Sequence, residues 1–218
     1  MKALLLKDWY LIEKQLKMYG AMVLFAIGFT IYFKNTSFAL TYMIILSSSV
    51  LLASISYDEM DNSFPALLCL PITRKQYVQS KYFASILMFL LNLCIMGTVT
   101  FFVHKSLDEE FMIVNWISEI SVAFFVFCML TSITLPLQLK FGVEKARSVM
   151  FVSYIGILAF IFLIYTAFEK FFKIDWMLLL TWLNNHLGLA FGALLMVGAG
   201  LYLLSYGISL KIFSDKEF

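Results

Sequence analysis

Long apolar runs separated by short polar stretches dominate the sequence. Five runs lack charged residues and meet or approach the ~20 residues that a helix needs to cross a hydrocarbon core of ~30 Å. A sixth run is long enough but contains Glu119, which lies ~20 residues before Leu139 and therefore at the membrane edge. The pattern predicts an all-α integral membrane protein in which residues 1–218 form a single transmembrane domain. The six predicted spans are about 18–33, 38–57, 82–103, 113–139, 149–168 and 187–210.

Two shorter segments are amphipathic or aromatic and do not span. In residues 1–17, Leu5, Trp9, Ile12 and Leu16 recur at helical spacing and form one apolar face. This pattern predicts a helix that lies in the membrane interface; the alternative is a leader that only fixes orientation. The apolar run 174–183 is too short to span and is either a re-entrant gate or an interfacial helix.

Composition and charge agree with a membrane protein and predict its orientation. Hydrophobic residues make up 62% of the chain and charged residues 14%, whereas soluble domains average about a quarter charged. The basic residues are unevenly distributed between the two sides of the predicted spans, and the richer side is expected to be cytoplasmic. Both termini are therefore predicted to be cytoplasmic. Twelve of the 16 lysines and arginines fall on that side: Lys2, Lys7, Lys14, Lys17, Arg74, Lys75, Lys81, Lys140, Lys145, Arg147, Lys211 and Lys216.

The stretch between the second and third predicted spans carries the signals of a short helix followed by a new helix start. Ser63 is a plausible N-cap, Pro65 is tolerated in a first helical turn, and Pro71 ends the helix. Thr73 and Gln76 then fit a capping box, which predicts that the next helix begins at Arg74. The short helix has an apolar surface and little room to bury it, which is typical of a contact site; alternatively, it folds back onto the bilayer. The predicted contact residues are Ser63, Phe64, Pro65, Leu67, Leu68 and Leu70.

A second cytoplasmic loop follows the fourth predicted span, in the sequence LPLQLKFGVEKAR. Pro136 can kink the span near its end, Gly142 suits a left-handed C-cap, and Glu144 falls in the first turn of the next helix. From the residues alone, a compact helical turn without a partner is the slightly favoured interpretation of the loop. The candidate contact residues are Lys140, Gly142, Glu144, Lys145 and Arg147.

The sequence lacks the motifs of an enzyme. It has no GxxxxGK[ST] phosphate loop, and its longest cytoplasmic loop, Asp58–Lys81, is far shorter than the ~50 residues of a domain. ATP hydrolysis on this chain is therefore excluded, and no catalytic, cofactor-binding or metal-binding residue is predicted. The spans hold no paired carboxylates, which argues against an ion-coupled carrier. His104 and His186 are far apart in the sequence and are expected to be polar interface residues.

Three stretches together resemble the ABC-2 type permeases of bacteria. They are MKALLLKDWYLIEKQLK before the first span, YDEM with LPITRKQYVQSKY between the second and third, and LPLQLKFGVEKAR after the fourth. The compact permeases of peptide exporters, and those of the phenol-soluble modulin exporters in particular, are the most similar. Their motifs do not define substrate-binding residues.

The resemblance implies how such a chain works. Two six-span permeases pair as a homodimer or heterodimer, and each docks on a separate ABC ATPase subunit, which binds ATP and Mg. Residues 63–70 correspond to the coupling helix, residues 1–17 to the interfacial connecting helix, and the segment before the last span to an outer gate. The implied function is ATP-driven export of amphipathic or hydrophobic peptides across the bacterial cytoplasmic membrane. The alternative is a membrane immunity or peptide-sensing protein that does not transport.

Overall fold

The computed structural model describes residues 2–60, 73–107, 113–172 and 187–215, and every regular element within these ranges is an α-helix. Helix α5 is interrupted at Gly142 and so has two arms, 113–141 and 143–172, which makes six helical segments in the described part of the chain. The predicted all-α class is confirmed. The helices are α1 (Lys2–Phe33), α2 (Thr36–Met60), α4 (Arg74–Leu107), α5 (Ile113–Phe172) and α7 (Leu187–Asp215).

Three stretches of the described helices are long and apolar enough to cross a membrane. They are Arg74–Ser106 in α4, Trp116–Gly142 in α5 and Gly188–Asp215 in α7, and they overlap the third, fourth and sixth predicted spans. Lys17–Phe33 in α1 is also apolar but shorter. The remaining predicted spans, and the total of six, stay predictions.

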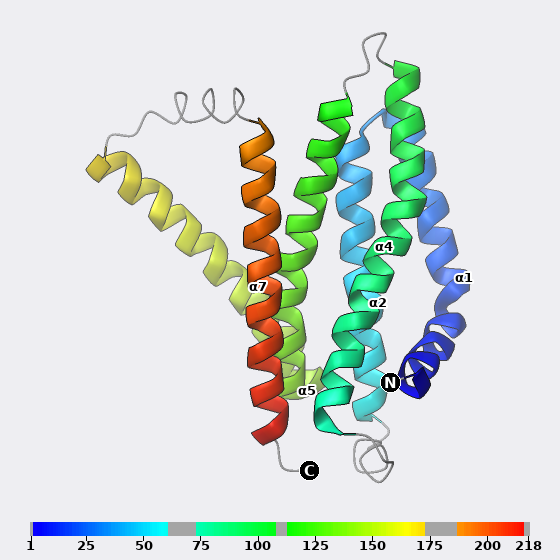
Figure 1. The fold of residues 1–218 in the computed structure, drawn as a ribbon, viewed down its shortest axis with the longest axis vertical. Helices are drawn as coiled ribbons and strands as arrows, with labels where there is room; N and C mark the ends of the chain where they lie inside the picture. Colours follow the sequence, from blue (N-terminus) through cyan, green and yellow to red (C-terminus); the bar gives the residue numbers. More distant parts are fainter. Residues whose placement is uncertain (1, 61–72, 108–112, 173–186, 216–218) are drawn as a thin grey trace.

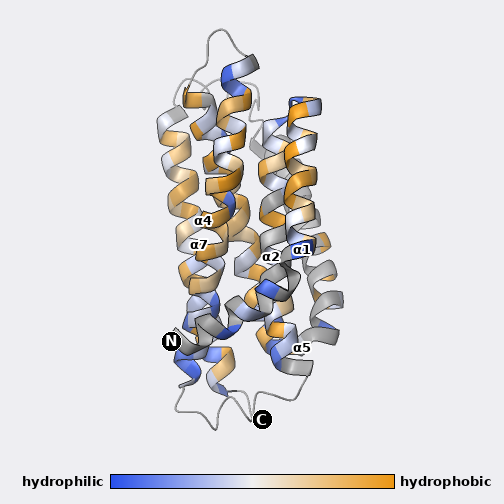
Figure 2. Cartoon of the chain, turned by 90° about the vertical axis from the view of Figure 1, so that its right-hand side faces the viewer, coloured by the Kyte–Doolittle hydropathy of each residue, from blue (hydrophilic) through white to orange (hydrophobic). Residues whose placement is uncertain are grey.

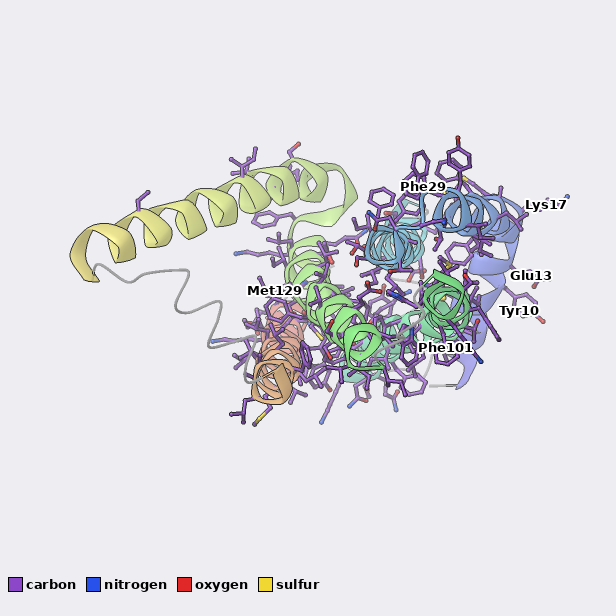
Figure 3. The ribbon with its side chains drawn as sticks, turned by 90° about the horizontal axis from the view of Figure 1, so that it is seen from above. Tyr10, Glu13, Lys17, Phe29, Phe101 and Met129 are labelled. Carbon is purple, nitrogen blue, oxygen red and sulfur yellow. The ribbon has the colours of Figure 1, made fainter. Side chains whose placement is uncertain are left out.

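The helices form a bundle with two parts that leave it (Figure 1). Helix α2 packs against α1, α4 and α5, while α7 packs against α4 and α5. The first turns of α1 run across the lower end of the bundle, and Tyr10, Glu13 and Lys17 point away from it (Figure 3). The arm 143–172 diverges from the bundle on the opposite side (Figures 1 and 3).

Apolar side chains lie both between the helices and on their outer surface. Figure 2 shows hydrophobic residues mainly along the middle of the helices and hydrophilic ones mainly near their ends. Leu24, Tyr32, Met196 and Leu203 are all at least two-thirds exposed. Helices that are hydrophobic all round are typical of a lipid environment, because lipid can cover the outward faces that water would not. The bundle is therefore suited to a membrane.

Gly142 makes the sharp turn between the two arms of α5. Its φ of 74° and ψ of 175° lie in a region that is essentially open to glycine alone. The predicted positive φ is confirmed. The ψ differs from that of a left-handed C-cap, which is close to +47°, so the backbone at Gly142 does not have the C-cap conformation.

Pro136 lies inside the first arm of α5, and the non-helical backbone angles of α5 occur at Gly142 instead. A proline lacks the N–H that would bond the carbonyl four residues earlier, which here is the carbonyl of Ser132. The Ser205 hydroxyl of α7 donates to that carbonyl at 2.9 Å. The neighbouring helix therefore supplies the hydrogen bond that the proline removes, and helix 113–141 continues past it.

Replacing Gly142 with alanine should destabilise the fold by about 1–3 kcal/mol, because a Cβ is strained at this φ and ψ. Thermal unfolding of the purified protein in detergent measures this as a lower Tm. Gly207→Ala is the matched control: Gly207 is helical and a Cβ there would meet nothing within 4 Å. An unchanged Tm in Gly142→Ala would contradict the expectation.

Candidate functional site

A buried charged cluster joins three helices at one end of the bundle. Asp58 in α2 is 3% exposed and Lys81 in α4 is 1% exposed, and the Lys81 Nζ lies 3.0 Å from the Asp58 Oδ2. The Lys7 ammonium of α1 donates to the Asp58 Oδ1. The Tyr77 hydroxyl donates to the Asp58 Oδ2 at 2.9 Å, and Lys81 also donates to the Ser54 Oγ at 2.7 Å. Both oxygens of a single carboxylate are therefore in use, one toward α1 and the other toward α4.

The environment of Asp58 favours its charged form. Burial on its own would raise the pKa of the carboxyl. The positive charge of Lys81, and the charge and hydrogen bond of Lys7, oppose that effect and lower the pKa below its ordinary value of 3.8. The cluster is thus a compensated ion pair at neutral pH. Such a pair contributes little net stability, but removal of one partner leaves a buried charge uncompensated.

Helix α7 is attached to the same end through aromatic and polar contacts. The ring of Tyr77 stacks on that of Phe213, with centroids 5.0 Å apart and planes 17° apart. The Lys81 Nζ lies 5.3 Å from the centre of the Tyr77 ring, within the range of a cation–π contact. The Arg74 guanidinium donates to the Ser214 carbonyl at 2.5 Å. The cluster around Asp58 therefore links α1, α2, α4 and α7.

The start of α4 follows the predicted capping box. The Gln76 N–H donates to the Thr73 Oγ1 at 3.3 Å, and the Thr73 N–H donates to the Gln76 Oε1 at 3.1 Å. The helix begins at Arg74, as the sequence predicts. Reciprocal bonds of this kind satisfy N–H groups that a helix start otherwise leaves without partners. The residue at which α4 begins is thus fixed by local chemistry.

The six predicted contact residues lie outside the described residues and stay predictions. They belong to the segment 61–72, which joins α2 to α4. The described residues on both sides of it, from Asp58 to Met60 and from Thr73 to Lys81, include Asp58, Tyr77 and Lys81 of the charged cluster.

The candidate residues of the second loop lie at the turn of α5. The Gln138 side chain donates to the Ser56 Oγ of α2 at 3.1 Å, so the turn lies beside the last part of α2. Gly142 is buried, and Lys140 and Lys145 are exposed. The backbones of Glu144 and Arg147 belong to the arm 143–172, and their side chains lie outside the described residues. The structure therefore brings this turn to the same end of the bundle as Asp58.

A second polar cluster lies at the opposite end of the bundle. Glu119 accepts hydrogen bonds from Thr36 at 2.9 Å and from Ser37 at 2.8 Å. The His104 Nε2 lies 3.0 Å from the Thr36 Oγ1 and 3.3 Å from the Glu119 Oε2. Glu119, which the sequence places at the membrane edge, thus joins α2, α4 and α5.

Sequence reasoning missed the cluster around Asp58, although a signal for it was present. Asp58 follows the second apolar run directly, and Lys81 precedes the third. Antiparallel neighbours joined by a short segment bring such positions together. Lys7 gave no comparable signal, because only the packing of α1 against α2 decides which charge it meets.

The family comparison agrees with this helical membrane body. A family model for ABC-2 family transporter proteins matches residues 3–214. The chain belongs to the ABC-2 family of transporters. Its members are membrane components of transporters, generally not enzymes, and an ABC ATPase is the partner that the family implies. No curated protein and no solved structure matches the chain. The finer resemblance to phenol-soluble modulin exporters stays a prediction.

In this ABC-2 protein, Asp58→Asn should lower the free energy of unfolding by about 3–5 kcal/mol, because Lys81 then remains charged, buried and without its counter-ion. Denaturant or thermal unfolding in detergent measures the loss. Asp215→Asn, at the exposed end of α7, is the matched control and should change stability by less than about 0.5 kcal/mol. Equal effects from the two variants would show that Asp58 is not a buried partner.

The pKa of Asp58 also predicts an acid-sensitive part of the stability. Because the folded-state pKa lies below the ordinary value of 3.8, the unfolded chain binds the proton first as the pH falls. The stability that ionised Asp58 contributes is complete above pH 3.8. It is lost as the pH falls through the lower, folded-state pKa. The wild-type chain should therefore lose more stability on acidification below 3.8 than Asp58→Asn does. Unfolding curves of both proteins over this range measure the difference, and parallel curves would contradict it.

Proposed function

We propose that the chain is the membrane-spanning permease subunit of an ATP-driven exporter of amphipathic or hydrophobic peptides. The observation that carries the proposal is an ABC-2 membrane bundle in which the charged cluster around Asp58 links α1, α2, α4 and α7, next in the chain to the predicted coupling helix. The chain has no phosphate-binding loop, so the energy must come from another protein. That protein is an ABC ATPase subunit, which binds ATP and Mg.

The distribution of charge supports a cytoplasmic position for the end that holds Asp58. Lys7, Arg74 and Lys81 lie at this end, as their contacts with Asp58 and Ser214 require. The positive-inside rule then puts this end in the cytoplasm and the Glu119 cluster outside. Both termini are cytoplasmic in this arrangement, and the protein is a multi-pass protein of the bacterial cytoplasmic membrane.

The proposed mechanism begins at the predicted coupling helix. Residues 63–70 present Phe64, Leu67 and Leu68 to the ATPase subunit, and closure of the ATPase dimer on ATP moves this helix. Since the segment is continuous with α2 and α4, its motion tilts both helices and opens the outer end of a cavity formed by two paired permeases. The second permease of the pair is an identical copy of this chain or a related chain. The second loop, at Gly142, provides a further contact with the ATPase.

The peptide cargo is inferred from the resemblance to peptide-export permeases and from the chemistry of the bundle. The surface is largely apolar, with few charges between the ends. An amphipathic peptide that partitions into the membrane can reach such a protein from the lipid. A non-transporting immunity or peptide-sensing protein remains the second candidate, and a chain that binds peptide but no ABC ATPase would favour it.

Replacing Phe64 and Leu67 with aspartate should abolish association with the ABC ATPase and leave membrane insertion intact, because two charges replace the proposed apolar contact. Co-purification of the tagged chain with its ATPase subunit from the native host, in detergent, measures association. Asn62→Asp with Thr73→Asp is the matched control: it adds two charges beside the proposed contact, removes no apolar residue, and keeps a capping side chain at position 73. Co-purification that survives Phe64→Asp/Leu67→Asp would contradict the assignment.

The wild-type complex also tests the cargo. A labelled synthetic amphipathic helical peptide of about 20 residues should stimulate ATP hydrolysis and accumulate inside inverted vesicles. A peptide of the same composition in scrambled order should do neither. No response to either peptide would exclude amphipathic peptides as the cargo class, and equal stimulation by both would show that amphipathic order is not what the protein recognises.

A further inference from the structure

The Asp58 carboxylate is the point at which three helices meet. Its Oδ1 accepts from Lys7 of α1, and its Oδ2 accepts from Tyr77 and lies 3.0 Å from the Nζ of Lys81, both in α4. Asp58 belongs to the last turn of α2, directly before segment 61–72, and Lys81 lies shortly after it. Asp58 and Lys81 are almost fully buried. The two ends that flank segment 61–72 are therefore bound to one another and to α1.

The contacts around this pair restrict its geometry. The Lys81 ammonium is held from three sides, by Asp58, by the Ser54 hydroxyl at 2.7 Å and by the ring of Tyr77 at 5.3 Å. Tyr77 in turn stacks on Phe213 of α7. A buried pair of this kind keeps its partners in one arrangement, because either charge alone would be costly to bury.

We infer that Asp58 and Lys81, with Lys7, are positioning residues that make the ends of α2 and α4 and the first part of α1 move as one unit. This inference rests on the proposed function, in which force enters the protein at this end. Without the pair, a force on segment 61–72 displaces α2 and α4 independently. With it, the same force also reaches α1, whereas α7 is held to α4 by Tyr77 and Arg74 in either case.

The variant that tests the inference is Asp58→Asn/Lys81→Met, which removes both charges of the pair and so avoids an unpaired buried charge. The side chain of Lys7 is 32% exposed and can turn to water once Asp58 is neutral. Lys75→Met, an exposed position on the same helix, is the matched control. Hydrogen exchange of the full-length chain is expected to rise at 54–60 and 74–81 in the double variant and to stay unchanged in the control.

The second readout separates positioning from stability and uses the complex with the ABC ATPase. Spin labels at Tyr10→Cys and Leu189→Cys, both at exposed positions, report the distance between the first part of α1 and α7, in a chain whose native cysteines are replaced by serine. In the wild-type background and in Lys75→Met, a non-hydrolysable ATP analogue should shift this distance. In the double variant, the ATPase should still bind and hydrolyse ATP, and the shift should be lost.

Three results would overturn the inference. A full distance shift in the double variant would show that the pair does not transmit motion. Loss of ATPase binding in the double variant alone would show that the pair only maintains the docking surface. Failure of the wild-type chain to bind an ABC ATPase would overturn the proposed function, and the inference with it. This result is distinguished from a failure of the inference alone because it is seen without any substitution.

Discussion

The charged cluster around Asp58 determines how the helices of this protein meet at one end. An aspartate at the end of α2 would be costly to bury alone, and so would Lys81 at the start of α4. Each compensates the other at 3.0 Å, and the second carboxylate oxygen binds Lys7 of α1. The pairing fixes which helix ends are neighbours on either side of segment 61–72. Both the ABC-2 bundle and its proposed coupling to an ATPase depend on that arrangement.

The same requirement, that polar groups find partners inside the bundle, explains the contacts between α4, α5 and α7. The carbonyl that Pro136 leaves without an N–H accepts from Ser205. The Ser205 hydroxyl lies 2.6 Å from that of Tyr82, which also lies 2.8 Å from the Ser209 hydroxyl. Lipid offers no hydrogen bonds, so hydroxyl groups of neighbouring helices serve one another. Small polar residues in the apolar runs are thus sites of helix contact.

The small residues of α7 show that a sequence motif does not choose its own partner. Gly188, Gly192 and Gly200 have the spacing of a helix-packing motif, yet in the part of the chain that the structure describes a Cβ at any of them would meet nothing within 4 Å. Gly198 makes the close contact instead, since a Cβ there would lie 3.5 Å from the Cβ of Cys128. Which side of α7 faces α4 and α5 is decided by the hydroxyl contacts of Tyr202 with α4 and of Ser205 with α5, together with the core residues around Tyr202.

The local features of this protein could be read from its sequence. The apolar runs predicted an all-α membrane protein, Thr73 and Gln76 predicted the start of α4, and Gly142 predicted a positive φ at the turn of α5. These features depend on residues close together in the chain, whose backbone preferences and side-chain reach are the same in any fold. Family membership also followed from the order and spacing of short stretches.

The distant pairings were decided only by the tertiary structure. Lys7 meets Asp58 across 51 residues, and Thr36 meets Glu119 across 83. The carbonyl freed by Pro136 accepts from Ser205 on a helix far along the chain, and the helix continues past the proline. Hydrophobic burial in lipid is non-specific: it favours helices that span the membrane and pack together, but it does not choose their partners. The few buried polar groups specify which helices pair and how they are aligned along their axes, because each must meet a partner that is remote in sequence.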